Sequence, residues 1–133
     1  MFLFLDIDGV LNTKADWKRM YTLRKENIEN MCRDYPNSKI ILISSWKLGF
    51  ISSKNPSNSA PIKELESLLN NGVRIVGKVD STKKFRDEQI AEYIKERPVI
   101  QEYLILDDDL TEYSSSFTKD KHLHIVNCNT GYI

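Results

Sequence analysis

The hydrophobic pattern of the chain alternates between short apolar runs and longer segments with helical spacing. The first run, residues 1–5, consists of five consecutive apolar residues, which is typical of a strand that is buried on both faces. Similar runs predict further strands at residues 39–43, 73–76, 102–106 and 123–126. A strand buried on both faces belongs at the centre of a sheet that helices cover on either side.

Three segments between these runs carry apolar residues at helical spacing. The pattern predicts helices over residues 23–35, from Pro61 to a left-handed stop at Asn71-Gly72, and over residues 86–97. The inward-facing positions are Ile28, Met31, Cys32, Tyr35, Ile62, Leu65, Leu68, Leu69, Ile90, Ala91 and Ile94. Because strands alternate with helices, we expect an α/β fold, a parallel sheet with right-handed crossovers in a Rossmann-like three-layer sandwich.

Two stretches have the composition of loops. Residues 11–21 are polar and mixed, which predicts a loop or a short flap over the strand ends. Residues 49–60 are rich in Ser, Asn and Pro, which predicts an exposed loop.

Composition limits the class of protein. A length of 133 residues, with 41% hydrophobic and 29% charged residues, fits a single globular domain over residues 1–133. The 19 basic residues balance the 19 acidic ones, so a polyanion would need a local basic patch. Cys32 and Cys128 have no metal-binding spacing and favour a reduced, cytoplasmic setting. No apolar run approaches the roughly 20 residues of a membrane helix.

Carboxylates follow the first predicted strand. Side chains alternate along a strand, so Asp6 and Asp8 are expected to project the same way, and Gly9 allows a sharp turn. Ligands of open α/β sheets bind beyond the carboxyl ends of the strands, which is where this pair of acids lies. A simple turn signal is the alternative interpretation of the pair.

A second acidic group, Asp107 to Asp109, follows the fourth predicted strand. In isolation it could cap a helix N-terminus. Carboxylates that are packed together repel one another unless a cation lies among them, so a sheet that brings these two strand ends side by side would favour a metal site there. His122 and His124 could also suggest a metal, but an exposed pair on an edge strand is the simpler interpretation.

Four segments in order resemble the motifs of the haloacid dehalogenase (HAD) superfamily, whose members are mostly Mg²⁺-dependent phosphatases that work through an aspartyl-phosphate. They are Asp6-Ile-Asp8-Gly9-Val10, residues 40–47 with Ser44 at a strand end, the basic residues Lys83, Lys84 and Arg86, and residues 103–109 with their paired acids. Short patterns, namely Leu11-Asn12, Ser44-Ser45-Trp46-Lys47, the segment from Arg86 to Ile90 and Asn129-Thr130-Gly131-Tyr132, are similar to small HAD domains associated with RNA-repair proteins.

The resemblance implies the architecture of the sheet. The strand order would be 5-4-1-2-3, which brings the first, second and fourth motifs together. The two places where HAD enzymes insert a cap domain hold only about a dozen and about ten residues here, too few for a domain. We therefore expect a capless domain with an open cleft.

The resemblance also implies roles for individual residues. Asp6 would be the nucleophile, and Asp8 would protonate the leaving oxygen and later activate water. Mg²⁺ would bind the Asp6 carboxylate, the backbone carbonyl of Asp8 and a fourth-motif acid, Asp108, with Asp107 as the second acid. Ser44 would donate a hydrogen bond to a phosphoryl oxygen.

The cation of the third motif has three candidates. Lysine is the norm in the superfamily and favours Lys84, whereas arginine is frequent in the RNA-repair-like domains and favours Arg86. The spacing leaves Lys83, Lys84 and Arg86 open. Lys18, Ser45 and Lys47 are further expected to contact the substrate.

The leading functional hypothesis is a Mg²⁺-dependent phosphomonoesterase that acts on a nucleotide or on the terminal phosphate of a polynucleotide. A binding protein that captures a phosphorylated ligand without turnover, a phosphoprotein phosphatase and a phosphotransferase with an acceptor other than water are the alternatives. Trp17 and Trp46 flank the predicted catalytic loops. Each could belong to the core or the rim, or could contact a base.

Overall fold

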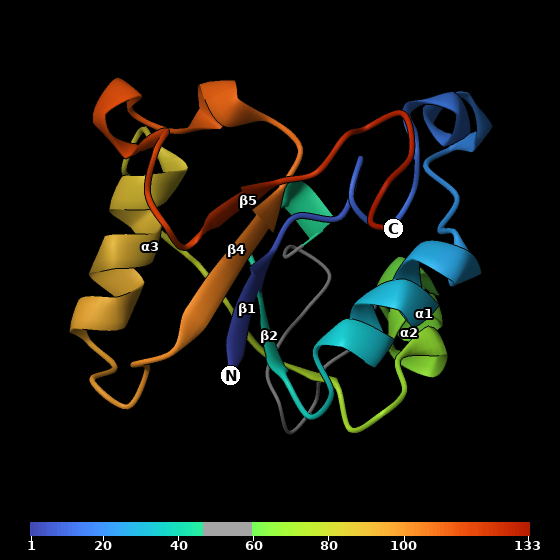
Figure 1. Ribbon diagram of the computed structural model, residues 1–133, viewed down its shortest axis with the longest axis horizontal. Helices are drawn as coiled ribbons and strands as arrows, with labels where there is room; N and C mark the ends of the chain where they lie inside the picture. Colours follow the sequence, from blue (N-terminus) through green and yellow to red (C-terminus); the bar gives the residue numbers. More distant parts are fainter. Residues whose placement is uncertain (47–59) are drawn as a thin grey trace.

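Five parallel strands form the centre of the computed structural model, which describes residues 1–46 and 60–133 (Figure 1). Along the sheet they lie in the order β3-β2-β1-β4-β5. The strands are β1 (Phe2–Leu5), β2 (Lys39–Leu42), β3 (Arg74–Lys78), β4 (Tyr103–Asp107) and β5 (Leu123–Ile125). This is the order that the resemblance implied, so the predicted α/β topology is confirmed.

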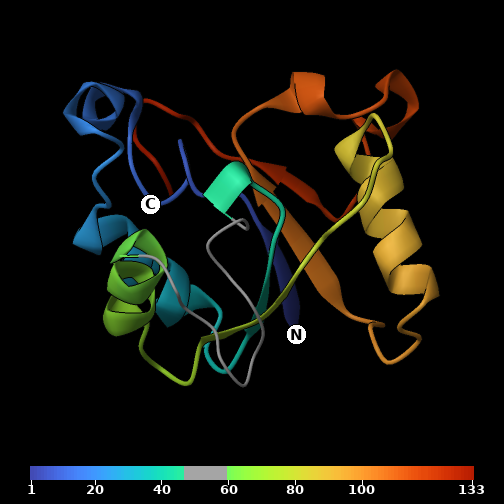
Figure 2. The ribbon, with the colours of Figure 1, turned by 180° about the vertical axis from the view of Figure 1, so that it is seen from behind.

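Helices cover both faces of the sheet. The helices α1 (Lys25–Asp34) and α2 (Ala60–Leu68) lie on one face, and α3 (Arg86–Lys95) lies on the other (Figures 1 and 2). Short 3₁₀ turns η1 (Lys14–Arg19), η3 (Leu110–Glu112) and η4 (Ser115–Phe117) follow β1 and β4. The result is the predicted three-layer sandwich.

Alternation along β1 separates the core into two halves. Leu3 and Leu5 point toward α1 and α2, where Ile28, Met31 and Ile62 are buried, while Phe4 points toward α3. On that second side Phe4 lies edge-on against Tyr93 and Tyr103. Because β1 is fully enclosed after Phe2, it reads in the sequence as an unbroken apolar run.

The prediction that α3 buries Ala91 is wrong. Ala91 is exposed, whereas Ile90 is buried and Tyr93 and Ile94 pack against the same cluster. Because the helix contacts the sheet along a narrow stripe, the small side chain next to Ile90 is turned to solvent.

The strand predicted at residues 73–76 begins and ends later in the structure. β3 runs from Arg74 to Lys78, and its pairing with β2 shifts register between Ile40 and Ile41.

Neither predicted insertion point carries a cap domain. Residues 9–24 hold only the 3₁₀ turn η1, and residues 79–85 hold no helix or strand. The ends of the strands therefore lack a covering domain in the described part of the chain. The loop predicted at residues 49–60 lies outside the described residues up to position 59.

The last residues return to the start of the fold. The amide of Tyr132 donates to the carbonyl of Val10 at 2.7 Å, and the amide of Lys14 donates to the carbonyl of Cys128 at 2.7 Å. The Asn27 side chain of α1 donates to the carbonyls of Thr130 and Tyr132 at 3.1 and 2.9 Å. We call residues 127–132 the C-terminal brace, since they fasten the turn after β1 to α1.

The sequence also made predictions about membrane helices and about the two cysteines. Within the described residues, no helix is both long enough and apolar enough to cross a membrane. Cys32 and Cys128 are free thiols, the first buried and the second partly exposed. The assignment of residues 1–133 to one domain and of the chain to the cytoplasm stays a prediction.

Asn27→Ala is expected to lower the free energy of unfolding by about 1–3 kcal/mol, because the carbonyl of Tyr132 loses the nearer of its two side-chain donors, at 2.9 Å. Asn30→Ala is the matched control, since the Asn30 amide lies 3.5 Å from the same carbonyl and is partly exposed. Urea titrations of both variants would measure the difference. An equal loss in both variants would contradict the bracing role of Asn27.

Candidate active site

The ends of β1 and β4 lie next to each other. Leu5 of β1 is in register with Leu106 of β4, and the Asp6 amide donates to the Leu106 carbonyl at 2.9 Å. The following residues, Asp6 and Asp107, are therefore neighbours across the two strands. By alternation from Phe4 they face the side of the sheet that α3 covers.

Three carboxylates meet at these strand ends. One oxygen from each of Asp6, Asp107 and Asp108 lies within 4.8 Å of the others. Asp6 and Asp107 are buried, and Asp108 is partly exposed. Gly9, with φ +87°, makes room for this carboxylate group, because a Cβ at that position would overlap the Asp108 carboxylate. Glycine is needed there both for the backbone angle and for the space.

Arg86 reaches the carboxylate group from the first residue of α3. Its Nη1 lies 2.5 Å from Asp107 Oδ2 and 3.5 Å from Asp6 Oδ1, and its Nε lies 3.8 Å from Glu112. The Arg86 side chain is only 17% exposed. Arg86 reaches the acids because α3, which begins at this residue, covers the face of the sheet toward which Asp6 and Asp107 point.

Other donors hold Asp107 in place. The Tyr113 hydroxyl donates to Asp107 Oδ2 at 2.7 Å, and the Asp109 amide donates to Oδ1 at 3.1 Å. The loop that carries Tyr113 is tied to α3, because Asp87 accepts hydrogen bonds from the amide and hydroxyl of Ser114 at 2.8 and 2.5 Å. Asp107 is thus oriented by the protein on both of its oxygens.

The carboxylates are poorly compensated by the protein alone. Burial raises the pKa of Asp6 well above its ordinary value, the charge of Asp107 and a shared hydrogen bond with Asp108 raise it further, and Arg86 offsets only part of this. Burial also raises the pKa of Asp108. For Arg86, burial would lower the pKa, but Asp107 and Asp6 outweigh burial and raise it.

This donor set fits a hard divalent cation. Carboxylate oxygens are the ligands that Mg²⁺ prefers, and a cation among them would remove the repulsion that raises the pKa of Asp6 and Asp108. Within the described residues, Asp6, Asp107 and Asp108 are the one group of three or more potential ligands that lie this close together. His122 instead pairs with Asp120 at 2.9 Å and stacks on Tyr103, and His124 is exposed.

Asp8 is held separately from that group. The Trp46 indole Nε1 donates to both Asp8 oxygens, each at 3.2 Å, and the Asn12 amide donates to Oδ1 at 3.1 Å. β1 ends at Leu5, so the strand alternation that predicted a common direction for Asp6 and Asp8 does not extend to Asp8. Two side chains from different loops set its position.

Asn12 connects several parts of the site. Its Oδ1 accepts from the Gly9 amide at 2.8 Å and from the Trp17 indole at 3.2 Å. Its Nδ2 donates to Asp8 and to the Tyr21 carbonyl, the latter at 3.3 Å. This buried side chain therefore fastens the turn after β1 to residues 13–24, which we call the flap.

Sequence reasoning gave Asn12 and Tyr113 no role. Asn12 could have been noticed as part of the short Leu-Asn pattern, whereas Tyr113 lies in a loop with no local signal. Trp46 belongs to the Ser44-Ser45-Trp46-Lys47 pattern and flanks a predicted catalytic loop, but its hydrogen bond to Asp8 depends on the fold.

The remaining predicted residues lie in different settings. Ser44 is buried at the end of β2, and its Oγ accepts from the Trp46 amide at 3.2 Å, while Ser45 is exposed. Lys18 is exposed on η1. Lys47 lies outside the described residues.

The candidates for the third-motif cation differ in position. Lys83 and Lys84 are exposed, and the Lys84 Nζ lies 5.2 Å from the centroid of the Phe85 ring. The structure brings Arg86 to the carboxylates, and not Lys84, the residue that the superfamily norm of a lysine favoured. α3 begins at Arg86, and the two lysines precede that helix on the exposed loop.

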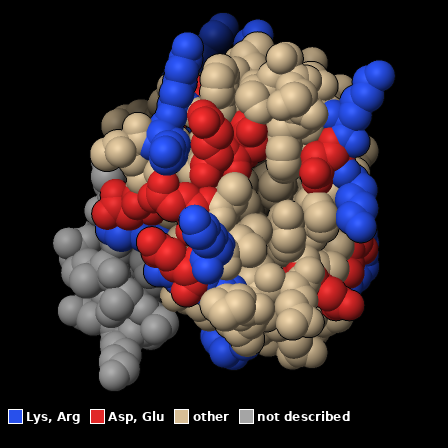
Figure 3. Space-filling view, turned by 90° about the vertical axis from the view of Figure 1, so that its left-hand side faces the viewer, with Lys and Arg blue, Asp and Glu red and all other residues tan. Residues whose placement is uncertain are grey.

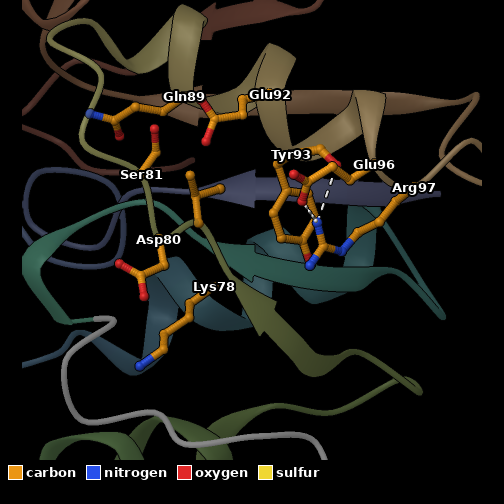
Figure 4. Close-up of a pocket in the computed structure, with 9 residues that line it drawn as sticks. Lys78, Asp80, Ser81, Gln89, Glu92, Tyr93, Glu96 and Arg97 are labelled. Carbon is orange, nitrogen blue, oxygen red and sulfur yellow. Dashed lines mark hydrogen bonds and ion pairs between the residues drawn. The ribbon is translucent and has the colours of Figure 1, made fainter.

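A cavity elsewhere is too small to be the site. It has a volume of about 80 Å³ and lies between the loop after β3 and α3 (Figure 4). Ligand pockets typically measure about 300–1,000 Å³. Arg97 closes its end by lying over the Tyr93 ring, 3.7 Å from the centroid. The cavity is lined by Lys78, Val79, Asp80, Ser81, Gln89, Glu92, Tyr93, Glu96 and Arg97.

The outer surface of the molecule on the α3 side has mixed charge. In Figure 3 acidic side chains gather across the upper left of this surface, with Lys and Arg side chains among and around them. A surface of this kind provides no continuous positive potential for a polyanion. A large anionic substrate would find more basic side chains on the flap, where Lys14, Lys18 and Arg19 are exposed.

Comparison with known families agrees with this geometry. A family model described as the HAD domain in Swiss Army Knife RNA repair proteins matches residues 2–132. The chain belongs to this HAD domain family. No curated protein and no solved structure matches the chain. Membership in the HAD family confirms the resemblance seen in the motifs and supports a phosphatase-like function; the roles of individual residues stay predictions.

The flap of this HAD domain is fastened by a buried acid. Asp16 Oδ2 accepts hydrogen bonds from the amide and hydroxyl of Thr13 at 2.8 and 3.0 Å and from Arg24 Nε at 2.7 Å. The hydrogen bond from Arg24 lowers the pKa of Asp16 from 3.8 to about 2, although burial opposes the shift. The ionised form of Asp16 therefore stabilises the folded flap.

This shift predicts a pH dependence. Because the pKa of Asp16 is lower in the folded state, its contribution is complete above the unfolded value of 3.8 and is lost as the pH falls through about 2. The difference in unfolding free energy between wild type and Asp16→Asn, about 1 kcal/mol, should stay constant from about pH 7 to about pH 5 and shrink below about pH 4.

Urea titrations at a series of pH values would measure that difference. Glu29→Gln is the control, since Glu29 forms an exposed pair with Lys25 at 3.7 Å and should change stability by less than about 0.5 kcal/mol at every pH. A difference for Asp16→Asn that does not depend on pH would contradict the ionic role of Asp16.

Proposed function

We propose that the chain is a Mg²⁺-dependent phosphomonoesterase that acts through an aspartyl-phosphate on the terminal phosphate of a nucleotide or polynucleotide. The observation that carries this proposal is the group formed by the buried Asp6 and Asp107 and the partly exposed Asp108, contacted by Arg86, at the ends of the adjacent strands β1 and β4 of a HAD domain. Each part that phosphoryl transfer needs has a candidate in this arrangement.

Asp6 is the proposed nucleophile. One of its carboxylate oxygens forms the bond to phosphorus while the bond from phosphorus to the ester oxygen breaks, and the ester oxygen takes a proton from Asp8. In the second step Asp8 takes a proton from water, the water oxygen attacks phosphorus, and the bond to Asp6 breaks. Trp46 and Asn12 hold the Asp8 carboxylate for both proton transfers.

Asp6, Asp108 and the backbone carbonyl of Asp8 are proposed to hold Mg²⁺. When bound, the ion neutralises the carboxylates and the charge on the phosphoryl oxygens. We assign Asp107 a positioning role, because its two oxygens already accept hydrogen bonds from Arg86, Tyr113 and the Asp109 amide. Arg86 and the Ser44 hydroxyl would then contact the oxygens of the transferred group.

The substrate is proposed to be large, because neither insertion point carries a cap over the strand ends within residues 1–46 and 60–133. The exposed cations of the flap, including Lys18, favour an anionic chain, and the family description refers to RNA repair proteins. Ser45 and Lys47 are proposed, from the sequence, to contact the substrate as well. The terminal phosphate of a nucleic-acid strand meets these conditions better than a free metabolite does.

A protein that captures a phosphorylated ligand without turnover is the second candidate. Its supporting observation is the tight pairing of Arg86 with Asp107 at 2.5 Å, which leaves less freedom for Arg86 to follow a moving phosphoryl group. The presence of both Asp6 and Asp8 favours turnover, since the roles of nucleophile and of acid and base arise only if a bond is broken.

A screen of phosphate esters with Mg²⁺ would test the proposal. Hydrolysis should require Mg²⁺, stop with excess chelator and be abolished in Asp6→Asn with the fold retained. Asp109→Asn is the matched control, because the Asp109 carboxylate caps η3 through Thr111 and does not belong to the group of Asp6, Asp107 and Asp108. The panel should include a generic aryl phosphate, mononucleotides, oligonucleotides phosphorylated at the 5′ or 3′ end, and phosphopeptides.

The outcomes of this screen separate the candidates. Undiminished turnover in excess chelator would show that the reaction does not need a metal. An active Asp6→Asn protein would show that Asp6 is not the nucleophile. Binding of phosphorylated oligonucleotides without any hydrolysis would establish the capture protein instead. Preference for phosphopeptides would identify a phosphoprotein phosphatase.

A second prediction separates Arg86 from Lys84. Arg86→Ala should lower kcat/KM by about 10²–10³-fold, as loss of one transition-state donor typically does. Lys84→Ala is the matched control, because this side chain is exposed and lies over Phe85. Steady-state kinetics on the best ester of the panel would measure both. A larger loss in Lys84→Ala would return the third-motif role to the lysine.

A further inference from the structure

The flap carries an exposed apolar surface beside the proposed catalytic residues. We propose that Trp17, Met20 and Tyr21, which we call the flap platform, bind the nucleobase of the nucleotide that carries the terminal phosphate. This inference rests on the proposed function, because the phosphate must lie at Asp6 for the base to reach the flap.

The backbone presents these side chains at a cost to the folded protein. Met20 and Tyr21 have φ angles of +59° and +57°, two consecutive left-handed residues without a glycine. Met20 is 91% exposed and Tyr21 is 47% exposed. Apolar side chains held in water by a strained backbone contribute little to folding, and such strain gathers at ligand-binding segments. The arrangement is explained if a ligand covers it.

The platform is rigid rather than a loose loop. The rings of Trp17 and Tyr21 stack with centroids 6.2 Å apart and planes 30° apart. The Trp17 indole is fixed to Asn12 Oδ1 at 3.2 Å, and the Thr22 hydroxyl closes the turn on the Arg19 carbonyl at 2.6 Å. An ordered aromatic pair loses little entropy when a flat ligand stacks on it.

One side chain joins the platform to the proposed acid. The Asn12 amide donates both to the Tyr21 carbonyl at 3.3 Å and to Asp8 Oδ1 at 3.1 Å. The Trp17 indole also bonds to this Asn12 side chain, so a single side chain separates the platform from the residue that is proposed to protonate the ester oxygen. This position suits the sugar and base attached to that oxygen, not a distant part of the strand.

The chemistry around the platform selects a nucleotide. Lys14, Lys18 and Arg19 are exposed on η1, which leads directly into Met20 and Tyr21. Aromatic side chains with cations beside them are the usual means of binding single-stranded nucleic acid, because every base offers a face for stacking. A thioether such as Met20 adds a polarisable contact that tolerates different bases.

The test compares substrates that differ only in one base. Two trinucleotides carry the same terminal phosphate, one with an intact terminal base and the other abasic at that nucleotide. In the wild type, kcat/KM should be about tenfold higher for the intact substrate, as stacking of one base implies. In Tyr21→Ala this ratio should fall toward one, and Met20→Ala should lower it in part.

Two control variants keep the test specific. Tyr21→Phe retains the ring and should keep the wild-type ratio. Val99→Ala removes an apolar side chain that is 75% exposed on the turn before β4, far along the chain from the flap, and should also keep it. Unfolding curves of all four variants establish that each is folded.

A binding measurement separates this inference from the proposed function. The metal-free protein is titrated with both trinucleotides while tryptophan fluorescence is recorded, and the intact base should quench the signal more strongly in the wild type than in Trp17→Phe. Base-dependent quenching in the metal-free protein, together with no hydrolysis of the intact trinucleotide once Mg²⁺ is added, would overturn the phosphatase and support the platform.

Hydrolysis with equal efficiency for both trinucleotides would overturn the platform and leave the phosphatase in place. Nucleobase binding would also be overturned if Tyr21→Ala lowered kcat/KM for a phosphopeptide by as much as for the intact trinucleotide, because the platform would then bind a peptide.

Discussion

The structure depends on the burial of like charges at the ends of β1 and β4. Asp6 and Asp107 are buried side by side because their strands are in register, and Asp108 joins them from the following turn. Such a group is unstable unless cations or hydrogen-bond donors surround it. Arg86, Tyr113 and the Asp109 amide contribute part of this compensation, while burial and the charge of Asp107 keep the pKa of Asp6 above its ordinary value.

This one constraint explains several distant features. α3 begins where its first side chain can enter the carboxylate group, and Asp87, the next residue, fastens the loop that brings Tyr113 to Asp107. Gly9 occupies a position where a side chain would displace Asp108. The other half of the chemistry is arranged separately, through Asn12 and Trp46 around Asp8. The two halves share only the short turn after β1.

The sequence predicted the parts of the site that follow from strands. Buried apolar runs that end in acids indicated that Asp6, Asp107 and Asp108 lie at strand ends, the strand order implied by the HAD resemblance made those ends neighbours, and the structure places the three carboxylates together. The choice among Lys83, Lys84 and Arg86 depends on where α3 begins and how it is turned, which composition does not reveal. Tyr113 and Trp46 reach their partners through loops whose paths depend on tertiary packing. Ala91 was misplaced because helical spacing does not give the width of the buried stripe.

The C-terminal brace has a consequence for how variants of this domain are interpreted. Residues 127–132 contribute no side chain to the carboxylate group, yet their backbone holds the Val10 turn and the start of the flap. A substitution there that lowers activity would act by displacing Gly9 and Asp108, or the platform beside Asp8. In a mutational scan, a loss of function at residues 127–132 would indicate that the backbone around the site has moved, and would not indicate lost contact with the substrate.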